Sequence, residues 1–175
     1  MQAFIENILQ QFNQYPENSR VWVYQADRIL NNNEVDTIES ALKSFVPSWA
    51  AHGKNLDASF AILFNTFVVL LVNESSEKAS GCSIDSSVKV IKDLGQQLNV
   101  NFFDRFAIAF IQGEEFNCVT KEQFQHLVNQ NKENLWVFNN TITSFYDLKN
   151  NWLKPFEESW HSTYFASPIP NLGSL

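Results

Sequence analysis

Cysteine, glycine and basic residues are scarce in this sequence. Its 175 residues include two Cys, five Gly, and 12 Lys and Arg against 19 Asp and Glu. Two cysteines are too few for a disulfide-rich scaffold or a cysteine-based zinc site. The formal net charge of −7 repels phosphate backbones, so we expect no nucleic-acid partner.

Long apolar runs are also missing. The longest, Phe67 to Val72, is far shorter than the ~20 residues needed to span a bilayer. Met1 is followed by Gln2 and Glu6 without the charged start and apolar core of a signal peptide. We therefore expect a cytoplasmic protein with no membrane span.

Two common ligand-binding patterns are absent as well. A phosphate-binding P-loop needs a glycine five positions before Gly-Lys-Ser/Thr, but Gly53-Lys54 is followed by Asn55, and position 48 is Ser. The three histidines are isolated from one another in the sequence. We expect no metal site and no cofactor.

Apolar residues are plentiful by contrast. Hydrophobic residues make up 45% of the chain and aromatics 14%, which is ample material for a packed core. Alternating and β-branched runs predict strands, and apolar residues at helical spacing predict helices. The expected strands are 20–25, 58–64, 67–72, 105–111 and 135–138, and the expected helices are 3–14, 34–45, 84–98, 121–129 and 144–152.

From residue 20 to 111 the order is β-α-β-β-α-β, which predicts a ferredoxin-like split βαβ fold with an antiparallel sheet. We expect one α+β domain over residues 1–166, with the core at 20–111, an N-terminal helix, and a C-terminal α/β extension at 112–166. A flexible tail is expected at 167–175, which holds two prolines and a glycine. An α/β layer with a different strand order is the competing fold.

Two helices cover only one face of such a sheet. The apolar second face must be covered by the N-terminal helix, by the aromatic C-terminal segment, or by a second subunit. An interaction or scaffolding module, possibly a homodimer, is therefore the first functional hypothesis. We favour cover within the chain slightly, because the tryptophans of residues 136–160 need burial.

The predicted topology brings two loops to one end of the sheet. One holds Trp49 and His52, the other Gly81 and Cys82. A thiol beside a helix N-terminus is biased toward the thiolate, and His52 or His161 could take its proton. The alternatives are that Cys82 is a small buried residue and that His52 bonds to the backbone.

The same helix start offers backbone N–H groups to an anion, with Ser83 as the expected N-cap. Plain capping would explain the serines equally well, and Asp85 already occupies the positive helix end. A small-molecule or thiol-dependent site is the second functional hypothesis, and whether the protein is an enzyme stays open. The catalytic candidates are Cys82, His52 and His161, and the ligand-binding candidates are Arg20, Trp49, Gly81, Ser83, Asp85 and Trp160.

The opposite end of the sheet gathers charged and polar side chains with less reactive chemistry. By the same topology it holds Asp27, Arg28, Asn101, Asp104 and Arg105.

Several stretches together resemble a family of small, uncharacterised bacterial proteins whose members often carry the label "ABC transporter ATPase". The resemblance covers roughly residues 15–165. This sequence has neither the P-loop nor an LSGGQ-type signature that the label requires, so the resemblance implies no catalytic residues. It rests on RVWVYQ at 20–25, WAAHG at 49–53, SGCSIDSS at 80–87, FFDR at 102–105, VFNN at 137–140 and SWH at 159–161.

Overall fold

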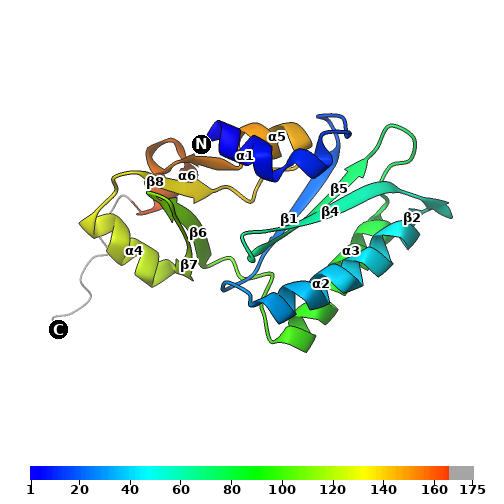
Figure 1. The fold of residues 1–175 in the computed structure, drawn as a ribbon, viewed down its shortest axis with the longest axis horizontal. Helices are drawn as coiled ribbons and strands as arrows, with labels where there is room; N and C mark the ends of the chain where they lie inside the picture. Colours follow the sequence, from blue (N-terminus) through cyan, green and yellow to red (C-terminus); the bar gives the residue numbers. More distant parts are fainter. Residues whose placement is uncertain (166–175) are drawn as a thin grey trace.

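The computed structural model describes residues 1–165, so the tail expected at 167–175 lies outside the described residues. Two antiparallel sheets lie side by side, one of three strands in the order β1-β5-β4 and one of four in the order β7-β6-β8-β9 (Figure 1). Helices pack against both. The α+β class predicted from the sequence is confirmed.

The first sheet is built around a fully buried central strand. β5 (Phe67–Asn73) lies between β1 (Arg20–Gln25) and β4 (Asp57–Leu63), and every residue from Phe67 to Val72 is buried. A strand buried on both faces reads as a continuous apolar run, as this one does. The β4–β5 turn places Phe64 and Asn65 at positive φ, and the Phe64 ring stacks on Phe116 of the second sheet.

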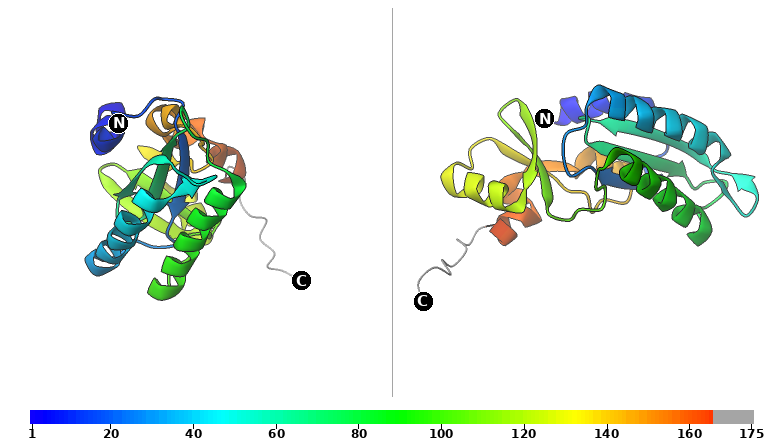
Figure 2. Two further views of the ribbon diagram at one scale, coloured as in Figure 1. Left: turned by 90° about the vertical axis from the view of Figure 1, so that its right-hand side faces the viewer. Right: turned by 90° about the horizontal axis from the view of Figure 1, so that it is seen from below.

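One face of this sheet carries two helices. α2 (Asn32–Phe45) and α3 (Gly81–Leu98) lie side by side there (Figure 2). Ile38 and Leu42 of α2 and Ile91 of α3 pack with the β5 residues that point to this face. Both helices begin with a capping box, with Asn31 and Ser80 as the N-caps.

The other face is covered from within the chain. α1 (Gln2–Ile8), the 3-10 turn Gln10–Phe12 and α5 (Phe145–Asn150) pack over it (Figure 1). The same cluster buries Trp152 completely and continues into the second sheet. The uncovered face that suggested a homodimer therefore does not exist in the described residues.

The four-stranded ferredoxin-like sheet is not confirmed. β1, β5 and β4 take the expected order, but the expected fourth strand is β6 (Ala107–Gln112), which belongs to the second sheet. β6 pairs through a short hairpin with β7 (Glu115–Thr120) and on its other edge with β8 (Leu135–Phe138). Closing that local hairpin loses less chain entropy than returning to β1.

A loop segment meets the free edge of β1 instead. Val21 N donates to Thr143 O, and Arg20 forms an isolated bridge with Ser144. The short hairpin of β2 (Ala50–Ala51) and β3 (Lys54–Asn55) lies beside α3 (Figure 1). The C-terminal half adds α4 (Lys121–Gln130), β9 (Leu153–Pro155) and α6 (Trp160–Phe165).

Candidate functional site

The sequence predicted a site at the end of the first sheet where β1 begins. In the structure, side chains at this end pack against one another. Trp49 is buried, and its Nε1 donates to Ser83 O at 2.8 Å, which fastens the start of α3 to the loop after α2. The Trp49 ring lies 5.7 Å from that of Trp22, over which the Arg20 guanidinium lies at 5.0 Å. These side chains therefore pack against one another.

Ser83 is not the N-cap of α3, as the sequence suggested. Ser80 caps the helix, and Ser83 occupies the third helical position of the capping box. With Ser80 as the N-cap, Gly81 and Cys82 lie in the first turn of the helix, and Asp85 lies beyond that turn. The Ser80 and Ser83 hydroxyls both form hydrogen bonds with the backbone at this helix start.

The three catalytic candidates are not brought together. Cys82 is exposed on the first turn of α3, and His52 is exposed at a positive φ of 51° in the β2–β3 turn. No hydrogen bond between them occurs in residues 1–165. His161 belongs to α6 in the other half of the molecule, where its ring is stacked 3.7 Å from that of Trp160.

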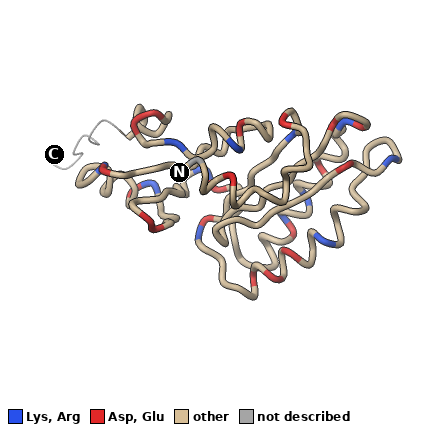
Figure 3. Tube along the Cα trace, turned by 45° about the horizontal axis from the view of Figure 1, so that its top comes forward, with Lys and Arg blue, Asp and Glu red and all other residues tan. Residues whose placement is uncertain are grey.

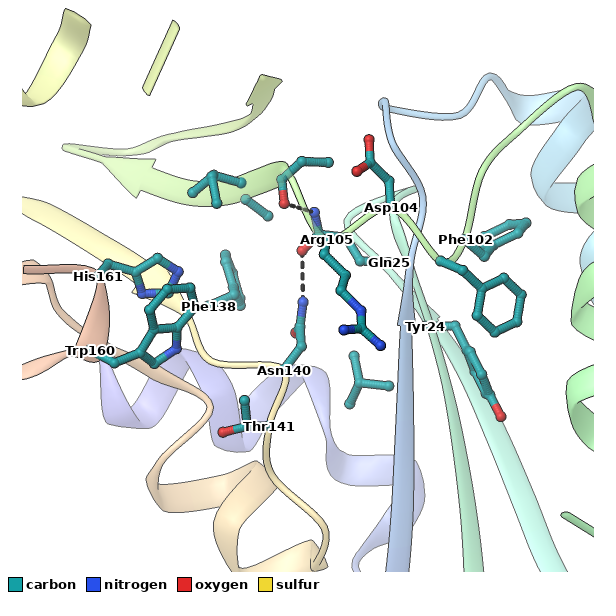
Figure 4. Close-up of a pocket in the computed structure, with 15 residues that line it drawn as sticks. Tyr24, Gln25, Phe102, Asp104, Arg105, Phe138, Asn140, Thr141, Trp160 and His161 are labelled. Carbon is teal, nitrogen blue, oxygen red and sulfur yellow. Dashed lines mark hydrogen bonds between the residues drawn. The ribbon is translucent and has the colours of Figure 1, made fainter. Parts of the chain in front are cut away.

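A cleft of about 510 Å³ opens at the opposite end of β1, between the two sheets (Figure 4). Its walls come from the last residues of β1, the loop before β6, the segment after β8, and α6. The labelled side chains in Figure 4 are Tyr24, Gln25, Phe102, Asp104, Arg105, Phe138, Asn140, Thr141, Trp160 and His161.

The side-chain amides of Gln25 and Asn140 form the floor of the cleft and are held in place by hydrogen bonds. Gln25 Nε2 donates to Ala107 O at 2.9 Å, and Asn140 Nδ2 donates to Gln25 Oε1 at 2.7 Å. Asn140 Oδ1 in turn accepts from Trp152 Nε1 at 2.9 Å. A chain of satisfied hydrogen bonds such as this one holds each amide in a single orientation.

Arg105 provides the positive charge of the cleft. Its side chain extends into the hollow between Tyr24 and Asn140 (Figure 4). Among the described residues it takes part in none of the ion pairs. The neighbouring Asp104 also lines the cleft, but its carboxylate points away from the Arg105 guanidinium in Figure 4, and its Oδ1 accepts from Phe106 N at 2.8 Å.

His161 is a buried neutral group in the cleft wall. It is 2% exposed, and within residues 1–165 its Nδ1 has no hydrogen-bond partner. Burial lowers the pKa of its imidazole to about 4, so the ring is uncharged at neutral pH. An unpaired buried polar atom is uncommon in a folded protein.

The thiol behind the cleft floor is inert. Cys118 contacts Gln25 Nε2 at 3.9 Å and Ala26 O at 3.6 Å. Burial, with help from the charges of Asp27 and Asp104, raises the pKa of the Cys118 thiol to about 11. It therefore carries almost no thiolate at neutral pH and supplies no nucleophile.

Comparison with protein-family models, with curated proteins and with solved structures found no match. Within residues 1–165, no cluster of His, Cys, Asp and Glu is arranged to hold a metal ion. None of the helices described is both long enough and apolar enough to cross a membrane. The site must therefore be interpreted from its own geometry.

The sequence placed Arg105 and Asp104 at this end of the sheet, but it favoured the other end because of its reactive side chains. Gln25 and Asn140 gave no signal, since an amide in a strand or a loop is unremarkable until its partner is known. Trp160 and His161 were candidates, and the structure assigns them to this cleft and not to the Cys82 loop.

Proposed function

We propose that the protein binds a small organic anion with a planar ring in the cleft between its two sheets. The observation that carries the proposal is Arg105, whose guanidinium extends into an aromatic-walled hollow without an acidic partner in the described chain. A planar guanidinium suits the geometry of carboxylates and sulfonates.

The volume and the walls of the cleft support this. A hollow of about 510 Å³ is within the range typical of small-ligand sites. Tyr24, Phe103 and Trp160 supply ring surfaces in the same hollow as the Arg105 guanidinium. Together they suit a flat ring bearing an acidic group.

Binding is favoured over catalysis. A histidine with a pKa of about 4 is a weak base at neutral pH, and a thiol with a pKa of about 11 is a poor nucleophile.

Charges of both signs are spread along the chain and do not gather into a basic surface (Figure 3). An interaction module and a cytoplasmic location stay predictions from the sequence.

Calorimetric titration with 2-naphthalenesulfonate tests the proposal. We expect Arg105→Gln to weaken binding about tenfold, because a charge-assisted hydrogen bond contributes about 1.5–3 kcal/mol. Arg20→Gln is the matched control, since Arg20 lies at the other end of β1 over Trp22 and 3.9 Å from Glu74. Equal affinities for Arg105→Gln and the unmodified protein would refute the proposal.

A further inference from the structure

A second, smaller hollow adjoins the cleft. It measures about 190 Å³ and shares Arg105, Ile108 and Trp160 with the cleft. It adds Phe106, Lys121 and Tyr164. The Trp160 ring thus forms part of the wall of both hollows.

Lys121 is the cation of this second hollow. Its Nζ donates to the Tyr164 hydroxyl and lies 4.7 Å from the centroid of the Tyr164 ring and 5.8 Å from that of Phe106. Among residues 1–165 no carboxylate forms an ion pair with it. The Tyr164 oxygen accepts from the ammonium, so its own hydrogen is left to donate to an anion.

The position of Lys121 is unfavourable for the fold alone. It is the first residue of α4, whose N-cap is Thr120. The positive end of the helix dipole repels a cation there. Lys121 lies between two aromatic rings and forms no ion pair in residues 1–165, although Glu122 is its neighbour in the same first turn, so its ammonium is suited to receive a negative charge from outside the chain.

Large exposed aromatic side chains surround the same place. Phe106 is 63% exposed, Tyr164 53% and Trp160 48%. Single exposed rings are ordinary, but several beside one hollow indicate a contact surface. Trp160 and Arg105 line both hollows, so this surface is continuous with the cleft.

We propose that the ligand of the cleft is a planar dianion, with one acidic group on Arg105, its ring beside Trp160, and the second acidic group on Lys121 and Tyr164. This inference rests on the proposed function and narrows its ligand class. Arg105 and Trp160 line both hollows and Lys121 lines the smaller one, and this juxtaposition of two cations with one exposed indole carries the inference.

Two probes that share a ring and differ in charge test the inference. Calorimetry compares 2-naphthalenesulfonate with 2,6-naphthalenedisulfonate at one fixed ionic strength, because surface charges are screened by salt. We expect the unmodified protein to bind the disulfonate at least about threefold more tightly. Lys121→Gln should abolish that preference and leave the monosulfonate affinity unchanged.

Matched variants separate the possible outcomes. Lys121→Arg keeps the charge and should keep the preference, while Lys89→Gln removes an exposed lysine that is paired with Asp93 and should change nothing. If the monosulfonate binds through Arg105 but Lys121→Gln retains the preference, the dianion inference is wrong and the proposed function stands. Binding of neither probe overturns both. Binding of the disulfonate alone, lost in both Arg105→Gln and Lys121→Gln, supports the inference.

Discussion

The two ends of strand β1 differ in how far their polar groups are paired with one another. At the Arg20 end, the Trp49 indole bonds to Ser83, the Ser80 and Ser83 side chains cap α3, and Lys54 pairs with Glu77. Ser19 Oγ is the buried atom left without a partner there. At the Gln25 end, Arg105 and Lys121 have no acidic partner among the described residues, and His161 Nδ1 is unpaired.

The contrast separates groups that hold the fold from groups that are available to a ligand. Reactive residue types occur at the Arg20 end, but its buried members serve packing, and no hydrogen bond joins the exposed Cys82 and His52 in residues 1–165. The Gln25 end has milder residue types in a hollow. Side chains that are not already paired within the protein therefore indicate the binding site better than chemically reactive residue types do.

Removing the anchor of the Arg20 end should produce the largest effect. Trp49→Ala deletes a fully buried ring and its hydrogen bond to Ser83, and should lower the free energy of unfolding by about 3–5 kcal/mol. Urea unfolding measures this. Trp160→Ala at the cleft is the control and should lose at most about 1 kcal/mol, because its ring is half-exposed. Equal losses of unfolding free energy in the two variants would contradict the difference described between the two ends of β1.

Acid should destabilise the protein through the Gln25 end. The pKa of His161 is about 4 in the folded chain and about 6.5 in the unfolded chain, so between these values the unfolded chain binds the additional proton. The free energy of unfolding therefore does not change through His161 above about pH 6.5, and it falls by about 3 kcal/mol as the pH is lowered to 4.

His161→Phe should remove that part of the pH dependence, as measured by urea unfolding at several pH values between 4 and 7. His52→Asn is the control, because His52 is exposed and asparagine tolerates its positive φ. Its stability should follow the same pH curve as that of the unmodified protein. A His161→Phe curve as steep as that of His52→Asn would show that His161 is not buried as described.

Replacing Cys82 should have the smallest effect on stability. Cys82→Ser should change the free energy of unfolding by less than about 0.5 kcal/mol, because the thiol is exposed. Iodoacetamide at neutral pH should label Cys82 in the folded protein and leave Cys118, whose pKa is about 11, unlabelled until it unfolds. Loss of about 1–2 kcal/mol in Cys82→Ser would instead place this thiol in the core.

Local patterns predicted the elements of the first sheet well. The apolar runs gave β1 and β5 nearly to the residue, and helical spacing gave α2 and α3. The start of α3 was misplaced because Ser80 and Ser83 are both good caps, and the choice between them depends on the Trp49 contact. β7 is as long as β1, but its sequence EFNCVT has no buried apolar run to reveal it, and β9 is too short at three residues to show a pattern.

Long-range pairing was beyond the sequence. Nothing in residues 107–112 shows which strand they join, and β7 and β8 decide it by occupying both edges of β6. The cleft depends on that outcome, since a β6 paired to β1 would leave no space between the sheets. Arg105, Asn140 and Trp160 therefore become neighbours only through the second sheet.

The five tryptophans allow a direct test of which end of β1 is the binding site. In a ¹⁵N-labelled sample each indole N–H gives one NMR signal, which the corresponding Trp→Phe variant assigns. Titration with 2-naphthalenesulfonate should shift the Trp160 signal most and leave Trp22 and Trp49 in place. A shift of Trp22 or Trp49 with Trp160 unmoved would contradict the assignment of the cleft as the binding site.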